Sequence, residues 1–256
     1  MAHVGVLRAL VENNIPIDFI AGTSAGSLVG GAFASGMTLD QIAELGRKMR
    51  WRNVGWATIS RLGVQSNYRL EKYLRDRLPI TRFEDLRLPF AAVATDLKSG
   101  TAVIMRDQGD VPFAIRASCA IPGIYVPVMD EEGRQLVDGG LVAVVPVSVA
   151  RSFGADIVIA VDVNSSGATF MGAILGSTRS LIGVMLQSMM VIQKTASHYQ
   201  LSMADFVINP KIGHIRWDQM RRSEELIALG YEAGLEAVPE ILELMDFSKK
   251  PHALTV

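Results

Sequence analysis

Ser24 stands at the centre of the pentapeptide Gly22-Thr23-Ser24-Ala25-Gly26, which has the form G-x-S-x-G. The apolar run Phe19-Ile20-Ala21 before it is typical of a short strand, and the small residues from Ser27 to Ala34 indicate a helix after it. A strand, a sharp glycine turn and a helix form a nucleophile elbow, which exposes a serine hydroxyl at the helix N-terminus. There the helix dipole and free N–H groups favour the negative charge that develops during attack. The pattern predicts that Ser24 is the nucleophile of an acyl-ester hydrolase.

The two glycines of the pentapeptide fit the same interpretation. A side chain at Gly22 or Gly26 is expected to collide with the neighbouring strand and helix, and Ser24 is expected to take a strained backbone. The alternative is a glycine-rich turn in which Ser24 caps the following helix. The strand before the turn and the helix after it favour the elbow.

A serine nucleophile needs a base, and the histidines are poor candidates. His3 falls in a first helix, His198 in a helical stretch, and His252 in the tail; His214 is the least unsuitable. Elbow enzymes that use histidine place the serine after several strands, and Ser24 comes too early for that order.

Asp138 is a better base, in Leu136-Val137-Asp138-Gly139-Gly140. An acid at the end of a short apolar strand, followed by two glycines, lets another backbone and a substrate approach closely. The alternative is a simple Asp-Gly hairpin turn.

The whole chain sets further bounds. Its 256 residues fit one domain spanning 1–256, and a net charge of -1 argues against nucleic acid as a partner. The single cysteine, Cys119, suits a reducing compartment such as the cytoplasm, and one cysteine with four scattered histidines makes a zinc site unlikely. No metal or cofactor is expected. The N-terminus does not resemble a signal peptide, and polar residues interrupt the apolar stretch from Ala168 to Ile192, which disfavours a transmembrane span.

Apolar strands alternate with helices along the chain. Strands are predicted over 90–95 and 101–105, and a central strand covered on both faces over 155–163. The alternation predicts an α/β fold with a mainly parallel sheet in a three-layer α/β/α sandwich. A closing helix is predicted from Arg221 to Glu243, broken near Pro239.

Together these motifs resemble the patatin-like phospholipases, especially their bacterial single-domain members, over roughly residues 2 to 245. That family uses a Ser-Asp dyad, with G-x-S-x-G carrying the serine and D-G-G or D-G-A the aspartate. Further stretches match in order: Ala94-Thr95-Asp96-Leu97 with Ser99-Gly100, Ala117-Ser118-Cys119-Ala120-Ile121-Pro122-Gly123 with Pro127, Asp138 to Pro146, Gly154-Ala155-Asp156, and Val161-Asp162.

The resemblance implies that Asp138 accepts the Ser24 proton directly and that an acyl-serine forms. It also implies a first strand and a glycine-rich loop, whose N–H groups bind the oxyanion, and nothing in this chain corresponds to them. The Ala25 N–H is therefore expected to supply the remaining oxyanion contact. Two alternatives stay open: a catalytically impaired or regulatory protein of the same fold, and a thioesterase or transacylase.

The expected substrate is a lipid or another acyl ester. The Met- and Leu-rich segment from Phe170 to Ile192 is either a core-packing helix or a helix that lines an acyl channel or lies on a membrane. Peripheral contact with the inner face of the membrane is consistent with the second reading.

Overall fold

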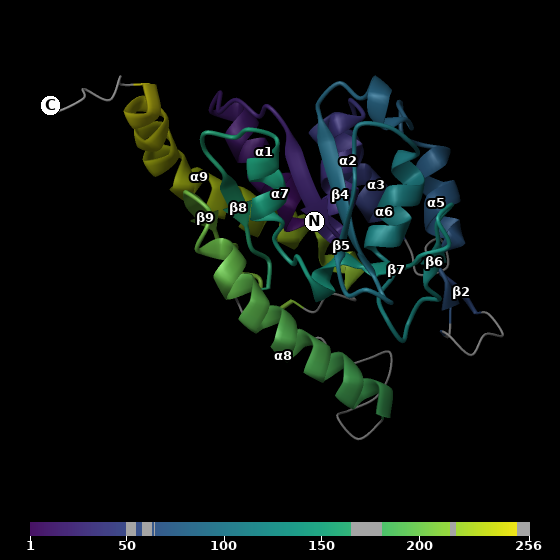
Figure 1. Ribbon diagram of the computed structural model, residues 1–256. Coiled ribbons are helices and arrows are strands. Elements are labelled where there is room, and N and C mark those ends of the chain that lie inside the picture. The colour runs from purple at the N-terminus through teal and green to yellow at the C-terminus, as the bar shows by residue number, and fades with distance from the viewer. Residues whose placement is uncertain (50–54, 58–62, 64, 165–180, 216–218, 250–256) are drawn as a thin grey trace, which may run out of the picture.

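A computed structural model of residues 1–256 shows the fold, and describes residues 1–49, 55–57, 63, 65–164, 181–215 and 219–249 (Figure 1). The helices are α1 Ala2–Glu12, α2 Ala25–Ala34, α3 Leu39–Lys48, α5 Tyr68–Arg75, α6 Val111–Ser118, α7 Val147–Ser152, α8 Leu181–Leu201 and α9 Ser223–Lys249, with short 3-10 turns η1 Phe83–Asp85, η2 Gly139–Leu141 and η3 Met220–Arg222. The strands are β1 Ile20–Thr23, β2 Trp56–Ala57, β3 Gln65–Ser66, β4 Phe90–Asp96, β5 Ala102–Met105, β6 Val128–Met129, β7 Gln135–Asp138, β8 Ile159–Val161 and β9 Phe206–Ile208.

Strand β4 lies at the centre of the sheet and is buried along its whole length. Phe90, Ala92 and Ala94 pack into the large core beneath α2 and α6, while Ala91 and Val93 face a second core that includes Val149 of α7. Successive side chains of a strand point to opposite faces, so this apolar run is covered on both sides. The predicted α/β fold, with helices on both faces of a central sheet, is thus confirmed (Figure 1).

The strand directions are mixed rather than mainly parallel. Parallel pairing joins β1 to β4 and β8 to β9, whereas β5 and β7 both run antiparallel to β4, and β6 antiparallel to β7. For β4 and β5, the reason is the short connection between the two strands. The Asp96 carboxylate accepts hydrogen bonds from the N–H groups of Lys98 and Ser99 and closes a tight turn between β4 and β5. A connection this short can join only antiparallel neighbours.

The segment 155–163 is not the central strand that its composition suggested. It contributes only β8, Ile159–Val161, whose described pairing is with β9 in a separate two-stranded sheet. Ile159 and Val161 are half-buried, and Ala160 alone of the three is buried. The fully covered strand is β4, because helices pack on both of its faces.

The closing helix does not break at Pro239. Helix α9 continues through that residue to Lys249, although proline removes one helix hydrogen bond. Ala237, Val238 and Ile241 around the proline are buried, so packing supports the helix through Pro239. Helix α9 crosses α1 closely: a Cβ on Gly230 would lie 2.0 Å from the Ala2 carbonyl oxygen. That contact anchors α1 beside the elbow.

Within the described ranges, no helix combines the length and the hydrophobicity needed to cross a bilayer. The segment 168–180 of the stretch tested above lies outside the described residues.

Candidate active site

The Ser24 turn has the strained geometry of an elbow. Strand β1 ends at Thr23, α2 begins at Ala25, and Ser24 between them has φ 52° and ψ -119°, a backbone that side-chain-bearing residues rarely adopt. The Ser24 side chain makes no capping hydrogen bond to the helix. Ser24 therefore occupies the N-cap position of α2 without a side-chain capping bond, and its hydroxyl is left for other partners.

Only one of the two predicted glycine collisions occurs. A Cβ on Gly22 would lie 2.6 Å from the backbone of Gly26 and Ser27, so this position admits glycine alone. A Cβ on Gly26 would meet only the His3 Nε2 atom, at an ordinary contact distance of 3.8 Å. The expected collision at Gly26 is wrong, because its Cα faces the side chain of α1 rather than the strand.

Strand register brings Asp138 to this turn. Thr23 of β1 pairs with Val93, and Asp138 of β7 pairs with Ala94, the next residue of β4. Strand β5 pairs with Ala92 to Thr95 of β4, a range that overlaps both the residues paired with β1 and those paired with β7. Two strands cannot pair with the same residue on the same edge. Strand β5 therefore lies on one edge of β4, and β1 and β7 share the other. The two strands run toward each other along that edge, and their carboxyl ends meet. Ser24 and Asp138 are the residues at those ends.

The Asp138 carboxylate is buried. Its residue is 4% exposed, and Oδ1 accepts a hydrogen bond of 2.8 Å from the Gly140 N–H. Burial raises the pKa of Asp138 from 3.8 to about 6, opposed by the hydrogen bonds from Gly140 and from the Ser24 side chain. The Asp138 carboxylate is thus held away from water at the end of β7.

Both glycines after Asp138 admit close neighbours. A Cβ on Gly139 would lie 2.2 Å from the Val93 carbonyl oxygen, and one on Gly140 would lie 2.7 Å from Nε2 of Gln193. The chain enters η2 here instead of turning back as a hairpin. The alternative reading of Asp138 as part of a hairpin turn is therefore wrong.

Ser118, whose sequence context assigned it no role, holds the elbow in place. Its Oγ accepts a hydrogen bond of 2.9 Å from the Ser24 N–H and donates one of 2.6 Å to the Val93 carbonyl. Thr23 adds a second tie, because its hydroxyl donates to the Ala143 carbonyl at 2.6 Å. The Ala-Ser-x-x-x-Pro block was the signal for Ser118, but no pattern in it shows which backbone groups the serine binds.

Cys119 lies beside the nucleophile. Its Sγ is 4.0 Å from the Oγ of Ser27, which lies in the first turn of α2. Burial and the Asp138 charge raise the pKa of the Cys119 thiol to about 12. The thiol therefore stays protonated near neutral pH and does not compete as a nucleophile.

The three histidines that the structure describes do not form a triad with Ser24. His214 pairs with Glu225 at 3.0 Å on the surface, His198 is exposed, and His252 lies outside the described residues. His3 lies against Gly26 at the start of α2, and its buried Nδ1 has no hydrogen-bond partner among the residues that the structure describes. Burial lowers the pKa of His3 to about 3, so its imidazole is neutral near pH 7. Because its Nδ1 has no partner, no carboxylate orients the ring at that atom.

Ala25 is the first residue of α2, so its N–H has no partner within the helix. The Ser24 N–H is occupied by Ser118. The first-turn N–H groups of α2 are thus the donors that this site offers to an oxyanion, and Ala25 stays the predicted one.

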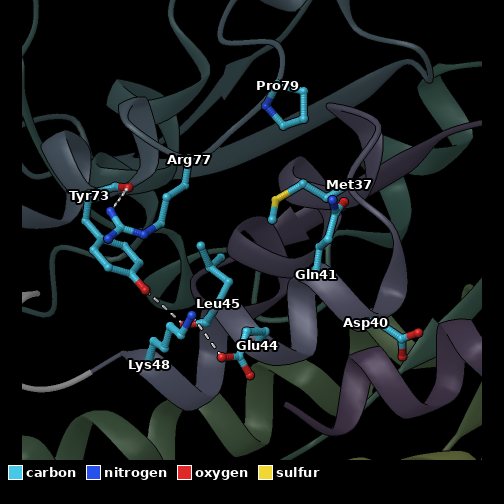
Figure 2. Close-up of a pocket in the computed structure, with 9 residues that line it drawn as sticks. All are labelled: Met37, Asp40, Gln41, Glu44, Leu45, Lys48, Tyr73, Arg77 and Pro79. Carbon is cyan, nitrogen blue, oxygen red and sulfur yellow. Dashed lines mark hydrogen bonds and ion pairs between the residues drawn. The ribbon is translucent and has the colours of Figure 1, made fainter.

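A hollow of about 410 Å³ lies between α3 and α5, away from the residues above (Figure 2). Its lining is Met37, Asp40, Gln41, Glu44, Leu45, Lys48, Tyr73, Arg77 and Pro79. The Tyr73 hydroxyl donates to the Leu45 carbonyl at 3.1 Å, and the Arg77 guanidinium stacks 3.8 Å above the Tyr73 ring. The lining includes neither Ser24 nor Asp138, so this hollow is separate from the candidate site.

The described part of the chain contains no group of three His, Cys, Asp or Glu side chains that could hold a metal ion. The groups around Ser24 include the Asp138 carboxylate, the Cys119 thiol, the Ser118 hydroxyl and backbone N–H groups of α2. They suit proton transfer and nucleophilic attack by a hydroxyl.

Fold and site together define an α/β protein with a serine elbow and a facing aspartate. The model of the patatin-like phospholipase family matches residues 1–151, which is more than half of the chain. The chain belongs to the patatin-like phospholipase family.

Curated relatives agree with this assignment. An uncharacterized NTE family protein of Mycobacterium tuberculosis is 38% identical over 170 residues, covering 65% of this chain and 46% of the relative. Patatin-like phospholipase domain-containing protein 7 of Rattus norvegicus is 34% identical over 66% of the chain, and Lysophospholipase NTE1 of Mycosarcoma maydis is 35% identical over 64%. The chain spans less than half of the mycobacterial protein, and 13% and 9% of the other two.

Among solved structures, VipD from Legionella pneumophila has a similar fold. The match has a TM-score of 0.51 at 12% identity and covers 93% of this chain and 64% of VipD. At that identity the likeness shows the fold alone.

Proposed function

We propose that this protein hydrolyses lipid acyl esters, of the phospholipase or lysophospholipase kind, with Ser24 as nucleophile and Asp138 as base. The observation that supports the proposal is the meeting of β1 and β7 on one edge of β4, because Ser24 follows the end of β1 and the buried Asp138 ends β7. Membership of a lipase family and a relative named as a lysophospholipase support lipid esters as the substrate class.

In the proposed reaction, the Asp138 carboxylate accepts the Ser24 hydroxyl proton as Oγ attacks the ester carbonyl. A carboxylate with a pKa near 6 is a stronger base than an ordinary aspartate and is still ionised at neutral pH. The first-turn N–H of Ala25 stabilises the oxyanion, together with the positive end of the α2 dipole. The alcohol leaves with the proton from Asp138, which then removes a proton from the water that hydrolyses the acyl-serine.

No metal or other cofactor enters this scheme. We propose peripheral contact with a membrane as the route to a lipid substrate. The single domain predicted for 1–256 stays a proposal.

One observation favours a second candidate, a catalytically impaired protein of the same fold. The Ser24 N–H is engaged by Ser118, which leaves the α2 first turn as the described source of oxyanion donors. Losing one such donor typically lowers turnover by about 100- to 1000-fold.

The experiment is turnover of p-nitrophenyl esters of increasing chain length, compared with lysophosphatidylcholine and acyl-CoA. We expect ester and lysophospholipid turnover that increases with acyl length and is lost in Ser24→Ala and Asp138→Asn. Preference for acyl-CoA would identify a thioesterase instead. Turnover that persists in Ser24→Ala would refute the proposal, and no turnover by the unaltered protein would favour the impaired one.

A further inference from the structure

The inner side of helix α8 carries two glutamines, Gln193 and Gln200. Together with Met189 and Ser197 they recur at spacings of three and four residues, which places all four on one side of the helix. That side faces the rest of the protein, because Met189 packs against the large core and Ser197 is buried. The two glutamine side chains therefore lie between α8 and the body of the protein.

The two amides are used differently. Both ends of the Gln200 amide bind backbone, since its Nε2 donates to the Val142 carbonyl at 2.7 Å and its Oε1 accepts from the Val145 N–H at 3.0 Å. These bonds fasten α8 to the segment that follows η2. Gln193 is half-buried and makes no hydrogen bond with any residue that the structure describes. Its amide is therefore free to bind a molecule that enters the site.

The Gln193 amide lies beside the candidate base. A Cβ on Gly140 would lie 2.7 Å from the Gln193 Nε2 atom and 3.0 Å from the Asp138 Oδ1 atom, so both polar atoms flank the same side of Gly140. No hydrogen bond joins them directly. They are at most about 6 Å apart, a span that one oxygen bridges with two ordinary hydrogen bonds.

The Asp138 Oδ1 atom has room for such a partner. It accepts one hydrogen bond, from the Gly140 N–H, and a carboxylate oxygen can accept a second. An oxygen that shares a proton with Oδ1 can therefore accept a hydrogen bond from the Gln193 N–H at the same time.

Resting on the proposed function, we propose that Gln193 binds the oxygen that exchanges a proton with Asp138. In acylation this is the oxygen of the leaving alcohol, which takes the former Ser24 proton from Asp138 as its bond to the acyl carbon breaks. In deacylation it is the oxygen of water, which gives a proton to Asp138 as it bonds to the acyl carbon. Asp138 then passes that proton to the Ser24 Oγ as the bond between Oγ and the acyl carbon breaks.

A neutral amide suits this place. The leaving oxygen carries negative charge before it is protonated, and the attacking water gains negative charge as it loses its proton, so an N–H donor stabilises and orients both. A lysine or arginine here would pair with Asp138 and lower its pKa, which would weaken the base. The Gln193 amide supplies the donor without adding a charge.

The variant Gln193→Leu removes the amide and keeps a side chain of similar bulk. We expect kcat for a p-nitrophenyl ester to fall on the order of 10- to 100-fold, the effect of one hydrogen bond to a developing charge. Because p-nitrophenolate leaves without a proton, acylation should change little and deacylation should slow. Acyl-serine on Ser24 should then accumulate to a larger fraction of the chains than in the parent, as measured by intact-protein mass spectrometry after acid quenching.

Fluorophosphonate labelling separates this role from a structural one. The reaction needs Ser24, Asp138 and an intact fold but no alcohol or water, so Gln193→Leu should label at the rate of the parent. Gln187→Leu replaces an exposed glutamine of the same helix and is the matched control, which should keep the kcat of the parent. Gln200→Leu should lower the urea midpoint and slow labelling and turnover together, because it frees the segment after η2.

Three results would overturn the assignment of Gln193: an unchanged kcat in Gln193→Leu, no increase in acyl-serine, or a labelling rate that falls in parallel with turnover. A parent protein that neither hydrolyses esters nor labels at Ser24 would instead refute the proposed function, and the assignment of Gln193 with it. The parent protein alone therefore distinguishes the two failures.

Discussion

Replacing Asp138 with Asn tests the energetics of the buried carboxylate. Asn fits the same volume, and its carbonyl oxygen still accepts the Gly140 N–H, so the fold should be kept. What the variant loses is a charge in a dry site. Burial raises the pKa of Asp138 from 3.8 to about 6, so ionising it destabilises the folded protein by about 3 kcal/mol.

The sign follows from proton binding. Between pH 3.8 and about 6 the folded protein holds a proton at Asp138 that the unfolded chain has lost. This group therefore lowers stability as the pH rises through that window, and its full effect remains above pH 6. Asn cannot ionise, so Asp138→Asn should be more stable than the parent by about 1 kcal/mol at pH 4.5 and about 3 kcal/mol at pH 7.5.

Urea denaturation of both proteins at the two pH values measures the difference. At pH 7.5 the variant's melting temperature should also rise by roughly 6 °C or more. The same change should lower kcat/KM for esters by at least about 100-fold, because the base is gone. In the parent, kcat/KM should increase with pH up to about 6 and then level off. A variant that is no more stable than the parent at pH 7.5, or whose advantage does not change with pH, would refute a buried and ionised Asp138.

Three other predictions concern the elbow and its neighbours. Gly22→Ala should prevent folding or unfold the elbow, because its Cβ would lie 2.6 Å from backbone atoms. Gly26→Ala should change the unfolding free energy by no more than about 1 kcal/mol. Equal effects of the two variants in urea denaturation would contradict this prediction. Ser118→Ala should destabilise the protein by about 1–3 kcal/mol and lower kcat, since the Ser24 N–H and the Val93 carbonyl lose their partner. An unchanged urea denaturation curve would show that these two hydrogen bonds do not stabilise the elbow. Cys119 should resist iodoacetamide at pH 7.5 until urea unfolds the chain, as followed by mass spectrometry, and rapid labelling of the folded protein would show that its thiol is not buried.

The local elements could be predicted because their signals are local. The apolar run before Ser24 and the small residues after it, which predicted β1 and α2, each act within a few residues. The central position of β4 and the short extent of β8 could not be predicted in this way. They depend on which helices cover each strand. An apolar run has the same sequence pattern whether or not helices cover both of its faces.

The candidate site was predicted in part for the same reason. Each half of the Ser24–Asp138 pair has a recognisable sequence around it. Their meeting depends on two strands sharing one edge of β4, a non-local arrangement that neither sequence contains. The collision expected at Gly26 failed because it depends on the direction of one Cα–H bond.

The most direct test of the central claim is covalent labelling with a fluorophosphonate, read by intact-protein and peptide mass spectrometry at pH 7.5. Such a reagent reacts with serine hydroxyls that a neighbouring base activates. We predict one adduct per chain, located on Ser24, slowed in Asp138→Asn and absent in Ser24→Ala. An unlabelled parent protein, or an adduct that persists in Ser24→Ala, would contradict the assignment of Ser24 as the nucleophile.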